Sequence, residues 1–328
     1  MPELIAAPRA AELLARMTGR RVVVIGDLMI DEWIWGDVTR ISPEAPVPVV
    51  AVRDHSFTLG GAGNVANNLR ALGAHVAFVG GIGDDAEGAR LRAMFDDLGV
   101  DARGLVTLRD RPTTRKTRVV AHNQQVVRAD WESTAALRDD DRARVAEHVK
   151  TAVRDADAVV LSDYAKGFLH RDVVEAALGA PVVVADPKPG NVGLFGGVTC
   201  IAPNAGEAGR ASGIAITDDA SLERAARALI AMLGCRFVLI TRGEQGMSLF
   251  GADGARFDVP AVARTVYDVS GAGDTVVAVL TLALAAGIAP ETATQLANFA
   301  AGAVVEKLGT ATASPREIVD LMEHAHGS

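Results

Sequence analysis

Cysteine and positive charge are both scarce in this chain. Its 328 residues include two cysteines, Cys200 and Cys235, and each lies in an apolar stretch, so two buried thiols are favoured over the alternative of a structural disulfide. The 33 Lys and Arg residues are outnumbered by 41 Asp and Glu residues, which leaves a net charge of −8. A nucleic-acid-binding protein needs a basic face, so this class is not expected.

Long hydrophobic runs are missing as well. No run of about 18 apolar residues occurs, so no membrane span is expected. Residues 1–21 carry charges throughout and lack the apolar core of a signal peptide. We therefore expect a soluble, cytoplasmic protein. With 49% hydrophobic residues and a mean hydropathy of +0.20, the chain can bury the core of one large α/β domain or of two smaller ones.

Short, β-branched, almost wholly apolar runs alternate with helical patterns. Such runs are typical of strands that helices cover on both faces, and the alternation favours a mainly parallel sheet of the α/β class. The predicted strands are 21–27, 75–83, 157–164, 181–187, 198–204 and 236–243, and the predicted helices are 63–73, 85–99, 140–153, 171–179, 221–234, 274–287 and 291–309.

Polar residues follow these strands where a ligand would bind. Ligands of parallel sheets bind beyond the carboxyl ends of the strands. The predicted strands end in Asp27, Asp163, Asp186, Asn204 and Thr241. The sequence therefore predicts a site along this edge of the sheet.

Two segments do not fit the alternation. Residues 31–61 are rich in proline and alternate apolar with polar side chains, and residues 113–132 are typical of a hairpin that turns near His122 and Asn123. We expect a small second sheet, a lid made of about 31–58 and 108–132, inserted in a single domain that spans 1–328. Its apolar face, with Trp33, Trp35, Val47 and Val49, needs cover, which favours closure over a ligand or a homodimer through the lid.

The stretch "YDVSGAGDTVVAVL" at 267–280 combines a glycine loop with a helix start. Free amides and the helix dipole make such a loop an anion site, and the dipole favours the ionised form of Asp274 in the first turn. An ionised carboxylate beside a phosphate-sized site can accept the proton of a hydroxyl that attacks phosphorus. Taken alone, an acid that merely stabilises the helix is an equally good interpretation.

A second glycine loop, "GGAGN" at 60–64, opens another helix. Dinucleotide-binding folds also use such loops, so a nicotinamide oxidoreductase is an alternative. The first strand is not followed by G-x-G-x-x-G, however, which makes this alternative weak. No G-x-x-x-x-G-K-[ST] occurs, which excludes a P-loop NTPase.

The two loops, about 210 residues apart, resemble the two signatures of the ribokinase-like (PfkB) carbohydrate kinases. The first runs from Gly60 through Asn64 and from Gly80 to Asp84, and the second runs from Asp268 to Thr275. The resemblance extends from about residue 20 to about residue 316. It implies a ribokinase-like three-layer sandwich and a sugar kinase that uses ATP and Mg²⁺.

The resemblance also implies roles for individual residues. Asp274 would be the base that deprotonates the acceptor hydroxyl, and the amides of Gly271, Ala272 and Gly273 would stabilise the transferred phosphoryl group. Asn204 and Glu207 would help to position the ATP phosphates and, indirectly, Mg²⁺, and Lys188 would bind a phosphate. The nucleotide would be bound by Thr241, Arg242, Gly243 and Asn298, and the sugar by Asp31, Gly60, Gly61 and Asn64. Asp268 and Ser270 would bind a monovalent cation such as K⁺. In isolation, Glu207 is an ordinary helix-start acid.

Within the family, the lid segments and "LSDYAKG" look like the heptose 7-phosphate kinases of lipopolysaccharide-core precursor synthesis. This resemblance implies transfer of the ATP γ-phosphate to the anomeric hydroxyl of D-glycero-β-D-manno-heptose 7-phosphate. A phosphorylated substrate needs cations, and these segments contain Arg111, Arg115, Lys116, Arg118, Arg128 and Lys166. We expect Lys116, Arg118, Lys166 and the neutral Gln124 to bind substrate, although any one basic residue could simply be solvated.

Other functions stay open at this point. The chain could be another ribokinase-like kinase, for ribose, fructose, a nucleoside or a fructose phosphate, or a sugar-binding protein on an inactive kinase scaffold. Some related kinases are fused to a nucleotidyltransferase with an H-x-G-H-like motif, and the tail "HAHGS" at 324–328 lacks its strand–loop–helix context. We therefore expect a kinase alone, with the second activity on another protein.

Overall fold

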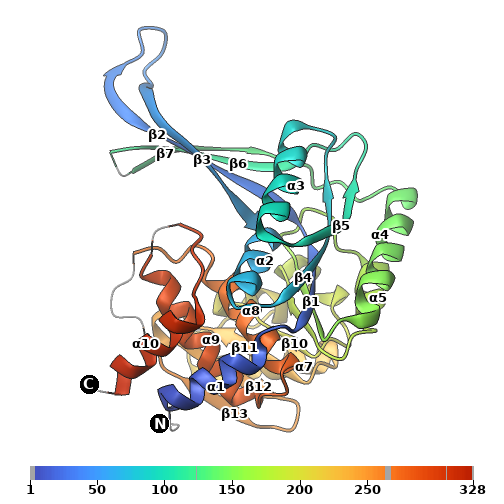
Figure 1. The fold of residues 1–328 in the computed structure, drawn as a ribbon. Helices are drawn as coiled ribbons and strands as arrows, with labels where there is room; N and C mark the ends of the chain where they lie inside the picture. The colour runs from blue at the N-terminus through green and yellow to red at the C-terminus, as the bar shows by residue number, and fades with distance from the viewer. Residues whose placement is uncertain (1–3, 123, 263–266, 308, 327–328) are drawn as a thin grey trace.

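The structure is a computed structural model that describes residues 4–122, 124–262, 267–307 and 309–326. Its centre is a nine-stranded sheet in the order β13-β12-β11-β10-β9-β8-β1-β4-β5 (Figure 1). All neighbouring strands are parallel except β11–β12 and β12–β13, which are antiparallel. The strands are β1 (Arg21–Gly26), β4 (His75–Ile82), β5 (Asp101–Thr107), β8 (Ala158–Ser162), β9 (Val183–Asp186), β10 (Cys200–Ile201), β11 (Phe237–Thr241), β12 (Met247–Gly251) and β13 (Arg256–Val259).

Helices cover both faces of this sheet, which explains the continuous apolar runs. In β1, Val22 and Val24 belong to one core, whereas Val23 and Ile25 belong to the other. Helices α1 (Ala7–Met17), α2 (Ala62–Ala71), α3 (Ala86–Leu98), α8 (Ala272–Ala285), α9 (Pro290–Val305) and α10 (Pro315–His326) contribute to the first core, and α4 (Asp139–Ala152), α5 (Arg171–Ala177), α6 (Ala205–Ser212) and α7 (Asp219–Leu233) contribute to the second. Short 3₁₀ turns lie at Val153–Asp155, Pro189–Leu194 and Gly243–Gln245.

Local capping sets the ends of several helices. Helix α3 begins after Asp85, whose carboxylate accepts the amide of Gly88 at 2.8 Å, and α7 begins after Asp218, which accepts the amide of Ser221 at 2.7 Å. Both helices end at a glycine in the left-handed conformation, Gly99 and Gly234. Glycine suits these helix ends because it adopts a positive φ without strain.

A separate four-stranded sheet, the lid sheet, projects from the body (Figure 1). Its order is β3-β2-β6-β7, with β2 and β6 parallel and the outer pairs antiparallel. Because β2 follows β1 after one residue, the chain passes directly from the central sheet into the lid sheet. Its strands are β2 (Leu28–Ile41), β3 (Pro48–Gly61), β6 (Thr114–Ala121) and β7 (Gln124–Trp131).

The predicted fold class is confirmed: an α/β fold with a mainly parallel sheet, helices on both faces and a small second sheet. The β6–β7 hairpin lies where the sequence predicts it, although Asn123 lies outside the described residues. The sequence interpretation missed α1, β5 and the antiparallel strands β12 and β13, and it gave no bounds for α6 and α10. Among the described residues, none of the helices is long and apolar enough to cross a membrane. Cys200 and Cys235 are buried, free thiols.

Candidate active site

The glycine loop before α8 leaves backbone amides open. Gly271 is the N-cap of α8 with φ 80°, and a Cβ there would lie 2.7 Å from Asn64 Nδ2, so only glycine fits without strain. The amide of Ala272 donates to the Val269 carbonyl at 3.3 Å. Among the described residues, the amides of Gly271 and Gly273 have no acceptor, and Gly273 is exposed. These open amides at a helix start suit an anion.

Asp274 lies in the first turn of α8 with both carboxylate oxygens engaged. Asn64 Nδ2 donates to Oδ2 at 2.7 Å, and the Tyr164 hydroxyl donates to Oδ1 at 2.8 Å. The residue is only 6% exposed. The three residues come from α2, the loop after β8 and α8, so the carboxylate is held in one orientation by distant parts of the chain.

Burial raises the pKa of Asp274 to about 6. The hydrogen bonds from Asn64 and Tyr164 and the charge of Lys188 act in the opposite direction, whereas the nearby carboxylate of Asp31 adds to the rise. The helix dipole was expected to favour the ionised form of Asp274. Desolvation, which favours the protonated form, outweighs this effect. A carboxylate with this pKa is ionised at pH 7 and is still basic enough to accept a proton.

Asn64 is in turn held by a buried chain of polar groups. Asn68 Nδ2 donates to the Asn64 carbonyl at 2.9 Å, and the Thr275 hydroxyl donates to Asn68 Oδ1 at 2.8 Å. This chain ties α2 to α8 beneath the glycine loop. Asn64 therefore acts as a positioning residue for Asp274 in this structure, and its predicted contact with sugar stays a prediction.

Tyr164 is a site residue that the sequence interpretation did not select. Its loop is fastened by Asp27, whose carboxylate accepts the amides of Tyr164, Lys166 and Phe168 at 2.8, 3.1 and 3.2 Å. Burial, and then the charge of Asp274, raise the pKa of Tyr164 well above its usual value, so the phenol stays a donor. The polar end of β1 at Asp27 was the available signal, because it pointed to this edge of the sheet.

The N-x-x-E pair forms a capping box at the start of α6. Asn204 Oδ1 accepts the amide of Glu207 at 2.8 Å, and Glu207 Oε2 accepts the amide of Asn204 at 3.1 Å. The other oxygen, Oε1, accepts Lys188 Nζ at 2.6 Å. Although burial acts in the opposite direction, the charges of Asp186 and Glu207 raise the pKa of Lys188. The pair thus has a structural role and also holds a lysine near Asp274.

Asp186, at the end of β9, completes a group of carboxylates around Lys188. Burial raises its pKa to about 7; Lys188 opposes this, and the charges of Asp274, Glu207 and Asp163 add to it. Among the residues that the structure describes, no group of three or more His, Cys, Asp and Glu side chains is arranged to hold a metal ion. A magnesium ion that keeps phosphate and water oxygens needs only one or two carboxylates, and this acidic edge fits it.

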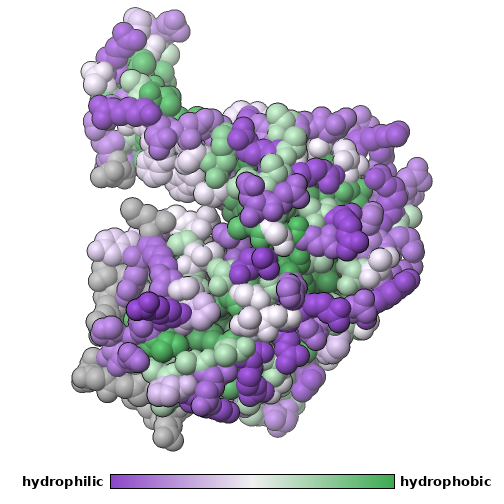
Figure 2. All heavy atoms as spheres, in the orientation of Figure 1, coloured by the Kyte–Doolittle hydropathy of each residue, from purple (hydrophilic) through white to green (hydrophobic). Residues whose placement is uncertain are grey.

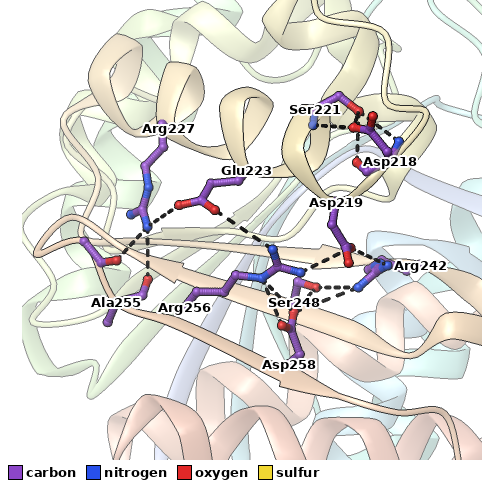
Figure 3. A network of polar contacts seen from close by, with 11 residues as sticks. Asp218, Asp219, Ser221, Glu223, Arg227, Arg242, Ser248, Ala255, Arg256 and Asp258 are labelled. Atoms are coloured by element: carbon purple, nitrogen blue, oxygen red, sulfur yellow. Dashed lines mark hydrogen bonds and ion pairs between the residues drawn. The ribbon is translucent and has the colours of Figure 1, made fainter.

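The segment predicted to line the nucleotide lies at the end of β11. Arg242 donates to Asp219 Oδ1 at 3.0 Å, and Arg256 joins the same oxygen at 3.2 Å (Figure 3). A cavity of about 400 Å³ opens between Arg242, the first turn of α7 and Ala205. Thr241 forms an isolated bridge with Asn204, which brings this segment next to the capping box.

Asn298 and Asp268 bond to the backbone in this structure. Asn298 is buried on α9, and its Nδ2 donates to the Pro260 carbonyl at 2.8 Å. Asp268 accepts the amides of Ser270 and Gly309 at 2.8 and 3.0 Å, which fastens the loop before α8. Burial acts against these hydrogen bonds, yet they lower the pKa of Asp268.

The predicted sugar residues lie where the lid sheet meets the body. Asp31 in β2 is buried and ion-paired with Arg118 in β6, which also lies over the Trp33 ring at 4.9 Å. A Cβ at Gly60 would lie 2.5 Å from Asp31 Oδ2, so the glycine allows the carboxylate to lie against β3. Gly61 is the N-cap of α2 with φ 58°. Asp31, Gly60 and Arg118 therefore lie together beside the glycine loops.

The other basic residues considered for the substrate phosphate, which lie in or beside the lid sheet, already have partners. Arg111 donates to the carbonyls of Ser133 and Ala135 at 2.6 and 3.2 Å and to that of Lys166, so it braces the backbone. The remaining ion pairs are Arg115 with Glu87, Arg128 with Asp130, Lys116 with Asp130 and Glu132, and Lys166 with Glu132.

Within a single chain, Gln124 lies far from these basic residues. It is exposed and pairs with Ala121, whereas Lys116 pairs with Asp130. Five residues along β6 separate the two positions, which corresponds to about 17 Å.

Comparison with known proteins assigns the chain to a family. A family model described as pfkB family carbohydrate kinase matches residues 20–317. The chain belongs to the pfkB family. It is 47% identical over 319 residues to the bifunctional protein HldE of Citrifermentans bemidjiense, covering 95% of this chain and 65% of that protein. It is 48% identical over 303 residues to the HldE of Desulfatibacillum aliphaticivorans, covering 91% of this chain and 62% of that protein.

The chain thus spans somewhat less than two thirds of the length of these curated pfkB relatives. Solved structures show the same fold at lower identity. A ribokinase of Arabidopsis thaliana complexed with ribose and ATP has a TM-score of 0.74 at 22% identity, with 93% of this chain and 99% of that chain covered. Phosphofructokinase-2 of Escherichia coli in complex with potassium has a TM-score of 0.80 at 19% identity, with 94% and 100% covered. The ribokinase-like fold expected from the sequence is confirmed.

Proposed function

We propose that this pfkB protein is an ATP-dependent kinase that phosphorylates the anomeric C1 hydroxyl of D-glycero-β-D-manno-heptose 7-phosphate, in the synthesis of lipopolysaccharide-core precursors. The observation that carries the kinase chemistry is Asp274, a buried carboxylate held by Asn64 and Tyr164 beside open amides of the glycine loop. Phosphoryl transfer requires positioning, charge stabilisation and a base, and these groups supply all three.

In the proposed reaction, Asp274 accepts the proton of the C1 hydroxyl as its oxygen attacks the γ-phosphorus of ATP. The new oxygen–phosphorus bond forms as the bond to the bridging oxygen of ADP breaks, and ADP leaves with that electron pair. The open amides of Gly271 and Gly273 donate to the γ-phosphoryl oxygens as negative charge spreads over them. The Ala272 amide, which donates to the Val269 carbonyl here, would join them only by giving up that bond. Tyr164 and Asn64 keep the carboxylate aimed at the hydroxyl.

The acidic edge near Lys188 would hold the ATP phosphates and Mg²⁺. Mg²⁺, when bound, neutralises charge on the β- and γ-phosphates. Asp186 and Glu207 are the residues that would bind it, directly or through water, and Lys188 would donate to a phosphate oxygen. Thr241, Arg242, Gly243 and Asn298 are proposed for the nucleotide. The potassium complex of the E. coli neighbour is a reason to test K⁺ at Asp268 and Ser270.

The heptose substrate rests on the resemblance of the lid segments and on HldE relatives at 47–48% identity. The proposal concerns the pfkB part that these bifunctional relatives share with this chain. We also propose that residues 1–328 act as one domain in the cytoplasm.

A homodimer through the lid sheet is part of the same proposal, because the lid sheet exposes large apolar side chains. These are Trp35, Ile41, Val47, Val52, Val126 and Val127. Figure 2 shows the lid sheet standing clear of the body with apolar surface along it. A second copy would cover this surface.

A coupled ADP-release assay with ATP and Mg²⁺ tests the function. It compares heptose 7-phosphate with ribose, fructose and fructose 6-phosphate. Turnover restricted to the heptose phosphate supports the whole proposal. Turnover with another sugar keeps Asp274 as the base and replaces the substrate. No turnover with any sugar would favour a sugar-binding protein on an inactive scaffold.

A further inference from the structure

Two lysines share one carboxylate where the lid sheet joins the body. Lys166 Nζ donates to Glu132 Oε1 at 2.8 Å, and Lys116 Nζ donates to Glu132 Oε2 at 3.3 Å. The lysine side chains are 17% and 14% exposed, and that of Glu132 is 26% exposed. Lys116 also donates to Asp130 at 2.9 Å. Two ammonium groups therefore converge on one pair of oxygens in a partly solvated position.

This cluster borders the candidate active site. Lys116 is the register partner of Asp31, and paired residues of neighbouring strands place their side chains on the same face of a sheet. Lys166 belongs to the loop fastened by Asp27, two residues beyond Tyr164, whose hydroxyl binds Asp274. The Cα atoms of residues 164 and 166 are at most about 7 Å apart. One short loop thus connects the base to the lysine pair.

The two lysines form an anion-binding site, and the Glu132 carboxylate already occupies it. A phosphate monoester presents several oxygens and up to two negative charges, and ammonium groups bind it through charge-assisted hydrogen bonds. Glu132 presents two oxygens and one charge to the same donors. Among the described residues, the Glu132 carboxylate has no partners other than Lys116 and Lys166. The Glu132 side chain can therefore rotate out towards the solvent when another anion takes its place.

We propose that Lys116 and Lys166 bind the phosphate that the sugar substrate already carries, and that Glu132 occupies their site in the free protein as an internal competitor. This inference rests on the proposed function and adds a basis for specificity. A phosphorylated sugar brings more charge than Glu132 and displaces it. A sugar without phosphate leaves the lysines paired with Glu132 and gains nothing from them.

The alternative role for Glu132 is structural, as a strut: its ion pair with Lys166 would hold the end of β7 to the loop after β8. The two roles predict opposite signs for Glu132→Gln. If Glu132 competes, its removal tightens phosphate binding; if it is a strut, its removal loosens the lid sheet and weakens binding. Asp37→Asn is the matched control, because Asp37 is a lid-sheet acid of similar exposure, 23%, ion-paired with Arg53 and changed by the same charge.

The experiment is titration calorimetry without ATP, at constant ionic strength, on the full chain. The probes are heptose 7-phosphate, the same heptose without phosphate, and inorganic phosphate. We expect Glu132→Gln to lower the Kd of both phosphate-bearing probes about threefold to fivefold. Lys166→Met and Lys116→Met should each raise it about tenfold or more. The Kd of the unphosphorylated heptose should not change in any variant, and Asp37→Asn should match the wild type.

Unchanged or weaker phosphate binding in Glu132→Gln would overturn the competitor role. If neither lysine substitution changes the Kd of inorganic phosphate, the proposed anion site is wrong, even if the kinase assay succeeds. If the wild type prefers the unphosphorylated heptose, the proposed substrate fails, and the inorganic phosphate titrations still decide whether the lysine pair binds phosphate.

Discussion

Replacing Asp274 with asparagine should greatly reduce turnover and, at alkaline pH, make the protein more stable. Burial raises the pKa of this carboxyl to about 6, compared with an ordinary value of 3.8. Keeping it ionised in the folded protein therefore costs free energy, and a pKa difference of this size corresponds to about 3 kcal/mol. Asparagine avoids this cost because it is neutral. Its amide can accept from Asn64 and donate to the Tyr164 oxygen, so the hydrogen bonds can be kept.

The gain in stability should depend on pH in a defined way. Above pH 6 the folded protein carries an ionised Asp274, and the full cost is present. Between pH 6 and 3.8 the carboxyl is protonated in the folded protein but still ionised in the unfolded chain, so the cost shrinks as pH falls. Below 3.8 both states are protonated and the difference vanishes. The advantage of Asp274→Asn is therefore expected at pH 8 and should be mostly lost by pH 4.5.

Urea unfolding followed by circular dichroism, at pH 8 and pH 4.5, measures this difference. Asp97→Asn, which removes an exposed carboxylate on α3, is the control and should change stability by less than about 0.5 kcal/mol. The same Asp274→Asn protein should lose roughly 10²–10⁴ in kcat while it still binds ATP. Equal or lower stability at pH 8 would refute the reasoning, because burial could then not be the dominant influence on this carboxyl.

Three further predictions concern the surroundings of Asp274. The value of kcat/KM should rise with pH and level off above about 6, because Asp274 must be ionised to accept a proton; a pH–rate profile checks this. Tyr164→Phe removes a hydrogen bond that lowers the pKa of Asp274, so the rising limb should move to higher pH in the same profile while ATP binding is retained. Gly271→Ala should lower kcat roughly 10²-fold, because φ is 80° and the new Cβ would lie 2.7 Å from Asn64; Gly193→Ala, in open space, should not.

The central strands could be predicted because their physical cause is local. A strand covered on both faces has few polar positions, and β1 distributes Val22 and Val23 to opposite cores. Strand β5 was missed because it lies at the sheet edge and its first residues are polar and partly exposed. The antiparallel strands β12 and β13 are short and follow one another without a helix, so they do not share the alternation that identified the others.

The candidate site was predictable to the extent that it is built from local motifs. The glycine loops and the N-x-x-E pair are short patterns, and the structure forms a helix start at each. The link between Tyr164 and Asp274 spans 110 residues, and no local pattern encodes it. Burial of Asp274 is likewise a property of the packed fold, which is why the sequence indicated only the influence of the helix dipole on its ionisation.

The parallel pairing of β2 with β6 has a consequence for the order of folding. These strands are adjacent in the lid sheet, yet β3, α2, β4, α3 and β5 lie between them in the chain. A parallel pair requires such a crossover, and contacts between distant residues form slowly because a long loop must close first. The β2–β3 hairpin, with Trp35 and Val52 exposed, therefore emerges from the ribosome well before its partner. We expect the part of the enzyme proposed to grip the sugar to be among the last parts to fold.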